Sequence, residues 1–429
     1  MSDSKDIGVG RREFVGVAAA AATITILKPS VVFGTQANSA IRLGLLGCGG
    51  RGRNVMGSFL ENTSGVLTAI GDMFQDNLDA GKKELDEVSA KFGKPAVDPK
   101  RLFRGPQAYQ QLFTSKDVDA LYIASPPYFH PDHLEAAIAS GKHIYLEKPV
   151  AVDVPGAKKV MALGERAKGK VSLAVGFQIR YASPYVELAK RIHEGQIGQP
   201  VSGLIHYFAS AINRPDWPNA SPAERRLRNW VHDKALSGDI IVEQNIHVID
   251  VTNWLLKGHP VKAVGSHGRA GRTDKGDCSS HFNCVYTYPG DVHIGFASTQ
   301  FGKSAWGVGM QYYGTKGCAE ARYDAPVRIS GETNWEFPGL KKPEPTDQAA
   351  AVTGTFHGAL DDADANKQKA FIASITSGNL LNEATQGAES ALAAMLGRMA
   401  ASTGEEATWE KLMKSKEVSD PKMDWKQFA

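Results

Sequence analysis

A glycine-rich turn that joins an apolar run to a helix-compatible segment constrains the fold of this chain more than any other feature. The run Ile41–Leu46 leads into Gly47-Cys-Gly-Gly-Arg-Gly52, and residues 54–60 suit a helix. The next apolar run begins at Val66 and ends at Asp72, about twenty residues beyond the turn. Strand, glycine turn, helix and a second strand that ends in an acidic residue are the pattern of a βαβ unit that binds a dinucleotide.

The glycines of this turn have separate roles in the predicted unit. Gly47 permits the tight turn, Gly49 lets the backbone approach a pyrophosphate, and Gly52 lets the helix pack closely on the strand. Gly50-Arg51 stands at the helix start, where free N–H groups and the helix dipole favour phosphate. Asp72 is expected to accept hydrogen bonds from ribose hydroxyls and to repel a 2′-phosphate, so the motif favours NAD over NADP. An ordinary glycine-rich turn remains the alternative.

The first forty residues have the pattern of an export signal. Arg11-Arg12 precedes an alanine-rich apolar stretch at 16–26, which Lys28-Pro29 makes too short to span a membrane. Paired arginines before a large apolar residue fit the twin-arginine type, so the mature protein is expected to be periplasmic. Because the periplasm is not expected to supply free NAD, such a protein would keep its cofactor bound and regenerate it in place. A basic leader with a chance arginine pair is the other interpretation.

Composition and charge are those of an ordinary globular protein. Hydrophobic residues make up 42% and charged residues 22%, and the net charge of +3 gives no indication of a nucleic-acid partner or an acidic membrane surface. Four cysteines in 429 residues do not form a disulfide framework, and whether Cys278 and Cys284 pair stays open. The spacing of the His and Cys residues suggests no metal site.

The periodicity of apolar residues changes near residue 180 and predicts two kinds of sheet. Up to that point strand-like and helix-like segments alternate, which predicts a doubly wound parallel sheet. The expected strands are 41–46, 66–70, 120–124, 143–146 and 171–177, and the expected helices are 77–92, 109–113, 131–140 and 155–168. Beyond residue 180, polar–apolar alternation predicts a large, mainly antiparallel open sheet. Its expected strands are 201–209, 261–267, 281–288, 292–300, 308–313 and 318–322.

We therefore expect an α/β protein built from consecutive parts. They are a signal peptide and linker at 1–40, a dinucleotide-binding Rossmann domain at 41–180, an α/β domain for substrate binding and oligomerisation at 181–360, and C-terminal helices at 361–429 that pack back on the Rossmann domain. Residues 214–228 are expected to form a loop and residues 330–355 an extended connection, because both contain several prolines. Helices are expected at 367–376 and 383–403.

Two loops at the carboxyl ends of predicted strands carry residues that suit a ligand site. Ser125-Pro126-Pro-Tyr-Phe-His130 follows strand 120–124, and Glu147-Lys148-Pro149 follows strand 143–146. Open parallel sheets bind ligands at this edge, so the first loop should border the nicotinamide ribose. A lysine in the second loop can donate hydrogen bonds to a substrate hydroxyl. A proline-rich connector and a surface Glu–Lys pair are the respective alternatives.

A third cluster lies in residues 238–255, which are predicted to form one helix. Apolar residues at 242, 246, 249, 251 and 255 make a helical stripe, and Glu243 and His247 are four residues apart on one face. A carboxylate beside an imidazole suits a proton relay, because histidine titrates near neutral pH and can act as a general base. Two zinc ligands without an evident third, and a purely structural helix, are the other interpretations.

Together these segments resemble the Gfo/Idh/MocA oxidoreductases, a family that includes glucose–fructose oxidoreductase and inositol dehydrogenase. The resemblance rests on the glycine turn with Asp72, the loops at 125–130 and 147–149, Gly176-Phe-Gln178-Ile-Arg180, the segment 238–255 and the turn 314–317. It implies a Rossmann domain followed by an α/β domain with an open sheet. It also implies hydride transfer between a nicotinamide and a carbinol carbon of a sugar or cyclitol.

The resemblance implies roles for individual residues. Lys148 would hold the reacting hydroxyl and His247 would exchange its proton. The family commonly has aspartate and glycine where this chain has Glu243 and Asn245, so Glu243 would orient His247, bind another hydroxyl or reach the substrate directly. The altered residues indicate a subgroup with its own substrate. The residues expected to bind the cofactor are Gly47, Gly49, Gly50, Arg51, Gly52, Asp72, Ser125, Pro126, His130, Glu147, Lys148 and Gln178.

The expected substrate site includes arginine and tryptophan residues, since tryptophan stacks on the apolar face of a pyranose ring and arginine donates to hydroxyls. The candidates are Arg180, Arg214, Trp217, Trp230 and His247.

The expected function is that of an exported oxidoreductase with tightly bound NAD that oxidises a secondary hydroxyl of a sugar, glycoside or cyclitol. A redox-neutral glycoside hydrolase or lyase that works through a transient keto-sugar is the alternative. A third possibility is a non-catalytic sugar-binding protein. The open sheet favours a homo-oligomer, a dimer or tetramer, without a membrane span.

Overall fold

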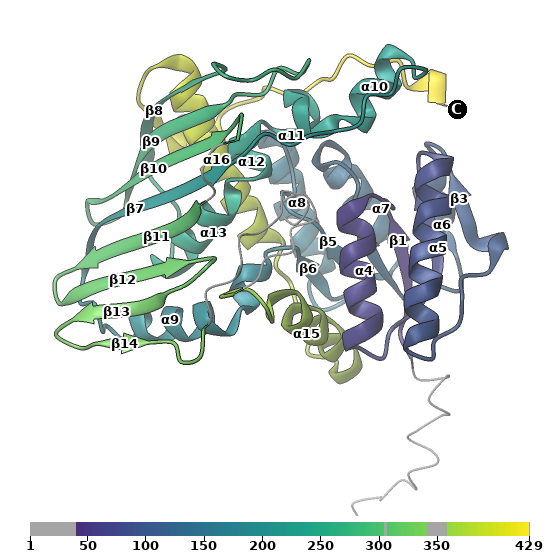
Figure 1. Ribbon diagram of the computed structural model, residues 1–429, viewed down its shortest axis with the longest axis horizontal. Helices are drawn as coiled ribbons and strands as arrows, with labels where there is room; N and C mark the ends of the chain where they lie inside the picture. The colour runs from purple at the N-terminus through teal and green to yellow at the C-terminus, as the bar shows by residue number, and fades with distance from the viewer. Residues whose placement is uncertain (1–39, 304–306, 341–357, 429) are drawn as a thin grey trace, which may run out of the picture. The chain divides into compact units, whose positions relative to one another are not determined.

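The computed structural model describes residues 40–303, 307–340 and 358–428. The predicted twin-arginine-type signal at 1–40 falls almost wholly outside the described residues, as does the second half of the predicted connection at 330–355. Residues 41–429 form one compact unit that contains two sheets (Figure 1). Within the described ranges, none of the helices has both the length and the apolar composition that a membrane-crossing segment requires.

The first sheet is parallel throughout and has the strand order β3-β2-β1-β4-β5-β6. Its strands are β1 (Arg42–Leu46), β2 (Val66–Asp72), β3 (Leu102–Arg104), β4 (Ala120–Ile123), β5 (His143–Leu146) and β6 (Leu173–Val175). The helices that connect them are α4 (Gly50–Asn62), α5 (Gln75–Lys91), α6 (Ala108–Thr114), α7 (His130–Ala139) and α8 (Val154–Ala167). The order reverses between β1 and β4, and such a switch point is where doubly wound sheets bind ligands. The predicted parallel sheet is confirmed.

The second sheet has the strand order β14-β13-β12-β11-β7-β10-β9-β8-β15. Its strands are β7 (Pro200–Ala209), β8 (Lys262–Gly268), β9 (His281–Tyr288), β10 (Val292–Gln300), β11 (Gly307–Gly314), β12 (Gly317–Arg322), β13 (Val327–Gly331), β14 (Trp335–Glu336) and β15 (Ala407–Thr408). Strands β7 and β10 run parallel, whereas the other neighbours run antiparallel. The predicted mainly antiparallel sheet is therefore confirmed.

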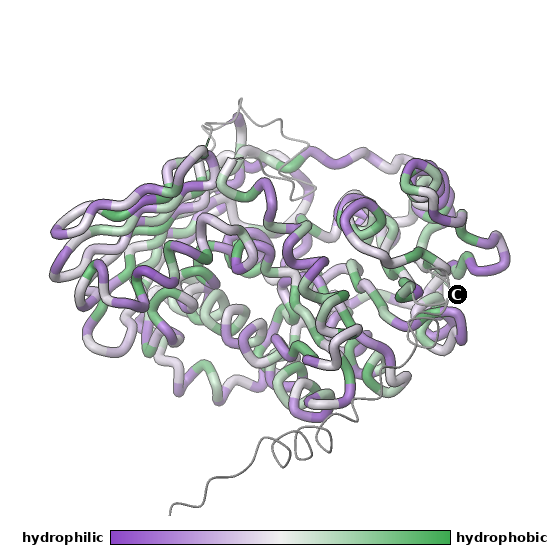
Figure 2. The backbone as a smooth tube through the Cα atoms, turned by 90° about the horizontal axis from the view of Figure 1, so that it is seen from below, coloured by the Kyte–Doolittle hydropathy of each residue, from purple (hydrophilic) through white to green (hydrophobic). Residues whose placement is uncertain are grey.

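One face of this second sheet is covered by helices and the other is open. Helices α9 (Ser183–His193), α13 (Ile246–Leu255) and α16 (Ala384–Thr403) lie on the covered face (Figure 1). Hydrophilic and hydrophobic residues alternate along the strands in Figure 2, as expected when one face is buried. On the open face the apolar side chains of Leu204, Val285 and Tyr313 are exposed.

The C-terminal helices connect the two sheets. Helix α15 (Ala363–Ser377) packs on α4, and α16 packs on both α8 and β8. A single hydrophobic cluster joins Leu146 of β5, Tyr207 of β7 and Leu392 of α16. This shared core fixes the position of the second sheet relative to the carboxyl ends of the parallel strands.

Two local predictions are wrong. The expected loop at 214–228 contains α10 (Pro222–Arg228), a short helix whose N-terminus is capped by the Ser221 hydroxyl (3.1 Å to Glu224 N). The expected single helix at 238–255 is interrupted: α12 (Ile240–Glu243) ends before α13 begins, and the backbone N–H of Asn245 bonds to the carbonyl of Ile240 (2.9 Å). A stripe of apolar residues indicates which positions are buried, but it does not reveal that the helix is interrupted within the stripe.

A candidate active site and its dinucleotide cavity

The glycine turn has the geometry of a phosphate cradle. Gly47 has a φ of +95°, and a Cβ there would lie 2.6 Å from the carbonyl oxygen of Ala124. A Cβ on Gly52 would lie 1.9 Å from the carbonyl oxygen of Gly47, whereas a Cβ on Gly49 would meet no atom within 4 Å. Helix α4 begins at Gly50 without a side-chain cap or an acidic residue in its first turn. The N-terminal end of the helix dipole therefore favours an anionic ligand at this turn.

A cavity of about 580 Å³ opens at this cradle. From the Rossmann side its lining includes Gly47, Gly49, Gly50, Asp72, Ser125 and Pro126. These residues come from the ends of β1, β2 and β4, on both sides of the switch point. The uncapped helix, the open space over Gly49 and the carboxylate at the end of β2 fit a dinucleotide.

The Asp72 carboxylate is held in one orientation by the surrounding backbone. Its Oδ2 accepts a hydrogen bond from the N–H of Cys48 (2.7 Å), and its Oδ1 accepts from the N–H of Phe74 (2.8 Å) and from Asn77 Nδ2 (3.1 Å). Burial raises the pKa of the Asp72 carboxyl, and these donors oppose that shift. The contacts fix the side chain at the rim of the cavity, where the sequence predicts the ribose hydroxyls.

His130 connects two loops of the site rather than lining the cavity. The ring nitrogens of this buried side chain lie 2.7 Å from the carbonyl oxygens of Pro149 and Ser125. The loop after β4 is thereby tied to the loop after β5. His130 was predicted to bind the cofactor, and the structure instead places it where it positions Ser125 and the residues next to Lys148.

Three of the predicted cofactor-binding residues meet in one buried cluster. Arg51 donates from Nε to Glu147 (3.0 Å) and from Nη2 to Gln178 (2.8 Å), and its guanidinium also binds both carboxylate oxygens of Asp364 (3.0 Å each). The Tyr122 hydroxyl donates to Glu147 as well (3.0 Å). Burial opposes the charge on Arg51, but the carboxylates of Asp364 and Glu147 outweigh it and raise its pKa. This cluster joins the glycine turn to the residue before Lys148.

Lys148 extends from the end of β5 to the break between α12 and α13. Its Nζ donates to the backbone carbonyl of Glu243 (2.6 Å) and lies 3.5 Å from Glu243 Oε1. An ammonium group has three protons. One of them is donated to the Glu243 carbonyl, so the ammonium can also donate to a ligand.

His247 lies in the first turn of α13 and is buried, with 5% of its surface exposed. Its Nδ1 has no hydrogen-bond partner in the part of the chain that the structure describes. Burial, followed by the positive charges of Lys148 and Arg51, lowers the pKa of His247 well below its usual value. The imidazole is therefore neutral at physiological pH and can accept a proton.

The predicted Glu243–His247 relay is not assembled as expected. Within the described ranges, the recorded partners of Glu243 include Lys148, and no hydrogen bond joins Glu243 to His247. The helix break separates the two residues, so the i,i+4 geometry of a continuous helix does not apply. Among the described residues there is no group of three or more His, Cys, Asp or Glu side chains that could hold a metal ion.

Comparisons with known proteins agree with this architecture. The model of the oxidoreductase family with an NAD-binding Rossmann fold, GFO/IDH/MocA, matches residues 41–177, and the model of the GFO/IDH/MocA C-terminal domain matches residues 185–320. The chain belongs to the Gfo/Idh/MocA family.

The similar proteins are curated enzymes and solved structures of several substrate classes. Inositol 2-dehydrogenase of Salmonella typhimurium is 30% identical over 219 residues, 50% of this chain and 54% of that protein. The alignment thus spans about half the length of this relative. The 1,5-anhydro-D-fructose reductase of Ensifer adhaerens is 24% identical over 281 residues, 64% of this chain and 79% of that enzyme. The structure of scyllo-inositol dehydrogenase from Lactobacillus casei with bound NAD(H) and scyllo-inositol has a TM-score of 0.65 at 19% identity, covering 87% of this chain and 100% of that one.

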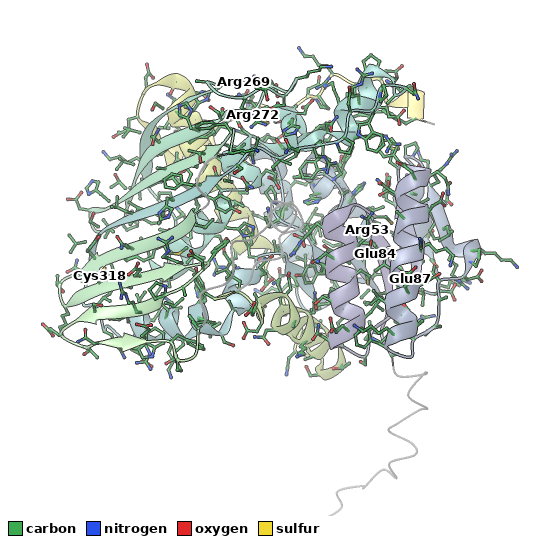
Figure 3. All side chains as sticks on the ribbon, viewed as in Figure 1. Arg53, Glu84, Glu87, Arg269, Arg272 and Cys318 are labelled. Carbon is green, nitrogen blue, oxygen red and sulfur yellow. The ribbon has the colours of Figure 1, made fainter. Side chains whose placement is uncertain are left out.

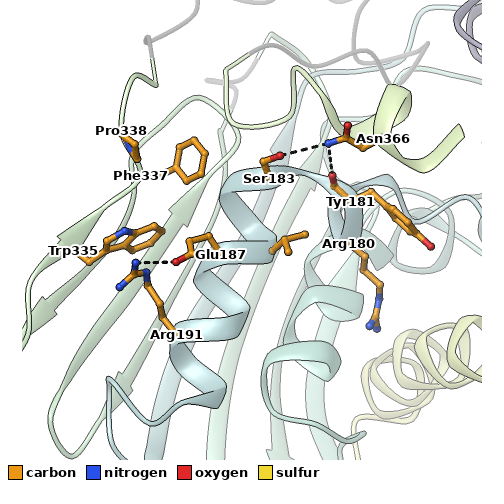
Figure 4. Close-up of a pocket in the computed structure, with 10 residues that line it drawn as sticks. Arg180, Tyr181, Ser183, Glu187, Arg191, Trp335, Phe337, Pro338 and Asn366 are labelled. Atoms are coloured by element: carbon orange, nitrogen blue, oxygen red, sulfur yellow. Dashed lines mark hydrogen bonds and ion pairs between the residues drawn. The ribbon is translucent and has the colours of Figure 1, made fainter. Parts of the chain in front are cut away.

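In this family member the predicted substrate residues do not gather at one place. Arg214, Trp217 and Trp230 line the dinucleotide cavity together with the glycine turn. Arg180 instead pairs with the buried carboxylate of Asp250 (2.9 Å between Nε and Oδ2). Arg180 is in the lining of a different cavity, and Figure 4 shows it on the opposite side of that view from Trp335. His247 alone among the five candidates lies beside Lys148 and Glu243.

The cavity lining also contains residues that the sequence interpretation did not assign. Arg53 of α4 donates to the carbonyl of Cys48 (3.0 Å) and pairs with Glu84 of α5 (2.7 Å). Figure 3 labels Arg53 and Glu84 on these two neighbouring helices. Phe74 follows Asp72, and Trp425 comes from the chain's C-terminal end. The sequence could have identified Arg53 and Phe74, because they lie next to the glycine turn and to Asp72. No local signal could have identified Trp425.

Asn245 is a second departure from the family pattern with a structural counterpart. The residue is fully buried between α12 and α13, and within the described part of the chain neither Nδ2 nor Oδ1 has a hydrogen-bond partner. An unpaired buried amide costs free energy unless a ligand or water satisfies it. Asn245 and His247, two positions apart, are thus both among the described side chains that carry a buried polar atom without a partner.

Proposed function

We propose that this chain is an NAD-dependent oxidoreductase that oxidises a secondary hydroxyl of a sugar, glycoside or cyclitol. The observation that carries the proposal is the placement of a cation, the Lys148 ammonium, near a neutral base, the His247 imidazole. The Lys148 ammonium is fixed on Glu243, and its charge lowers the pKa of His247, whose Nδ1 has no partner among the described residues. The family match and the polyol- and sugar-converting relatives support the same reaction class.

The chain's own residues suit the removal of a hydroxyl proton. The Lys148 ammonium donates a hydrogen bond to the substrate oxygen and stabilises the negative charge that develops there as its proton leaves. The neutral imidazole of His247 accepts that proton. Bound NAD supplies the hydride acceptor, so the carbinol C–H and O–H bonds become a carbonyl group. The cluster of Arg51, Glu147 and Gln178 holds Lys148 at the end of β5 during this step.

The finer parts of the proposal concern compartment and assembly. We propose that the twin-arginine-type leader exports the folded protein with NAD in place, so that a second carbonyl substrate takes the hydride back. The exposed apolar side chains on the open sheet face, Leu204 at 57% exposure among them, favour a homo-oligomer formed through that face. Sedimentation of the purified protein tests the assembly, and NAD released on denaturation tests whether the cofactor stays bound.

Product analysis tests the reaction itself. The holoprotein is incubated with inositols, aldoses and aryl glycosides, and the products are identified by mass spectrometry. A keto-sugar or keto-cyclitol supports the proposal, whereas a cleaved glycoside without net redox change would favour the redox-neutral alternative. Lys148→Met and His247→Asn should each abolish turnover and retain NAD. Lys316→Met and His293→Asn, on the second sheet, are the matched controls.

A further inference from the structure

The dinucleotide cavity has a second wall that does not belong to the Rossmann domain. Across from the glycine turn, the cavity is lined by Arg214, Pro215, Trp217, Leu227, Arg228 and Trp230, and by Trp425 near the chain's C-terminal end. We call residues 214–230 and 419–428 together the clasp. Both segments lie far in sequence from the β1–α4 turn that they face.

One contact of the clasp lies on the adenosine side of the cavity. Arg228 forms a bidentate ion pair with Asp76 (2.9 and 3.1 Å), and its guanidinium lies over the rings of Phe74 (3.8 Å) and Trp217 (4.3 Å). Phe74 follows Asp72 in the loop after β2, and Asp76 lies in the first turn of α5. The acid at the end of β2 marks the adenosine ribose. The Arg228 side chain is 11% exposed although its segment is a surface excursion.

The other contact lies on the opposite side of the switch point. Trp425 stacks on Tyr128, with ring centroids 6.2 Å apart and planes 21° from parallel, and meets the edge of Phe129 at 5.4 Å. Tyr128 and Phe129 follow Ser125 and Pro126 in the loop after β4, which also lines the cavity. The clasp thus touches the Rossmann domain at both ends of the cleft.

The two segments of the clasp are also joined to each other. Arg226 donates to the carbonyl of Pro421 (2.9 Å), and the Ser221 hydroxyl donates to the amide oxygen of Gln427 (3.1 Å). Figure 1 shows α10 and the C-terminal end side by side above the parallel strands. Opening one end of the clasp therefore strains the other.

From this arrangement we infer that Arg228, Trp217 and Trp425 are cofactor-retaining residues, and that the clasp must open before a dinucleotide can enter or leave. The inference rests on the proposed use of NAD, and it gives a physical basis for a cofactor that stays bound through many turnovers. An open Rossmann cleft lets the dinucleotide exchange from the strand ends, whereas here that exit is covered from both sides. Trp217, which the sequence placed in the substrate site, thereby acquires a different role.

The dissociation rate of NADH tests the inference without use of the enzyme reaction. The full chain is loaded with NADH and mixed with excess NAD in a stopped-flow fluorimeter, and the loss of NADH fluorescence is followed. Arg228→Ala, Asp76→Ala and Trp425→Ala are each expected to release NADH at least about tenfold faster than the wild type, because each removes a stacked or charge-assisted contact. The double variant Arg228→Ala/Asp76→Ala should be no faster than Arg228→Ala alone, since loss of Arg228 already breaks the pair with Asp76.

Arg269→Ala is the matched control. Arg269 pairs with Asp274 at 3.2 Å within a surface loop at the edge of the second sheet (Figure 3). The Arg269→Ala variant should therefore release NADH at the same rate as the wild type. As a second measurement, trypsin cleavage after Arg225 or Arg226 should slow when NADH is bound, because closure of the clasp protects the segment. Thermal unfolding of each variant without NADH establishes that it is folded.

The outcomes are distinguishable. Release rates within twofold of the wild type for all three variants, in protein that binds NADH, would overturn the inference and leave the proposed function intact. A wild-type chain that binds no dinucleotide would overturn both.

Discussion

Lys148 donates a hydrogen bond from its Nζ to the backbone carbonyl of Glu243 at 2.6 Å, while the Glu243 carboxylate lies at 3.5 Å. Lys148 is therefore held mainly by the backbone carbonyl at the C-terminal end of α12 and only secondarily by the Glu243 side chain. Because a backbone acceptor cannot be removed by substitution, the position of the ammonium depends on the helix break between Glu243 and Ile246.

Replacement of Glu243 by glutamine should consequently have a limited effect. The variant keeps the carbonyl that fixes Lys148 and loses only the ion pair, whose 3.5 Å separation is longer than a charge-assisted hydrogen bond. We therefore expect kcat to fall about threefold. Steady-state kinetics with the substrate identified by product analysis measures this effect. A loss as large as that of Lys148→Met would show that the carboxylate itself takes part in the reaction.

The pH dependence of activity should follow the pKa of His247. Burial and the charges of Lys148 and Arg51 lower this pKa, so the imidazole stays neutral and able to accept a proton as the pH falls through 6.5. We expect kcat/KM to stay constant to below that pH. In Lys148→Met the missing charge should raise the pKa, which the titration of the His247 Hε1 resonance by NMR detects without turnover. An unchanged titration curve would contradict the proximity of the Lys148 ammonium to His247.

Substitution of Arg51 should destabilise the fold. Arg51→Met leaves the carboxylates of Glu147 and Asp364 without their partner, and 6% and 20% of these side chains are exposed. The free energy of unfolding in urea is expected to fall by about 3 kcal/mol, the cost of breaking a buried pair. Arg53→Met, two residues along α4, should cost under about 1 kcal/mol, since its partner Glu84 is 52% exposed.

Asp72 should determine the choice between NAD and NADP. Asp72→Asn keeps an oxygen for the N–H groups of Cys48 or Phe74 but removes the charge that repels a 2′-phosphate. The ratio of the Kd values for NADPH and NADH should shift about tenfold toward NADPH, which corresponds to about 1.4 kcal/mol. Isothermal titration of both dinucleotides checks this shift. Equal ratios in the variant and the wild type would place the ribose away from Asp72.

Stability should decrease on acidification because of His133. Burial lowers the pKa of this side chain to about 3, and its Nδ1 lies 2.9 Å from the Ser125 hydroxyl. The unfolded chain therefore binds more protons between pH 3 and 6.5. The contribution of neutral His133 to the free energy of unfolding is fully present above pH 6.5. About 2 kcal/mol of that contribution is lost by pH 5. Urea unfolding at pH 7.5 and 5.0 should show a smaller difference for His133→Gln than for the wild type.

The elements that could be predicted are those whose determinants are local. The glycine turn, Asp72 and the strands of both sheets follow from short patterns, because a strand of period two or a turn with a positive φ at Gly47 is encoded by adjacent residues. Lys148 and His247 were predicted together through the family resemblance. The contact of Glu243 with Lys148 instead of His247 was not predicted, since it depends on a break that the apolar stripe does not reveal.

The sequence by itself determined the two-sheet architecture and the nucleotide-binding turn, and it supplied Lys148 and His247 as candidate site residues. Only the tertiary structure decided that Arg228 and Trp425 meet the Rossmann loops and that Arg180 pairs with Asp250. The reason is physical: local patterns set backbone conformation and the buried face of each element. Contacts between segments seventy or more residues apart depend on how the shared core orients the two sheets.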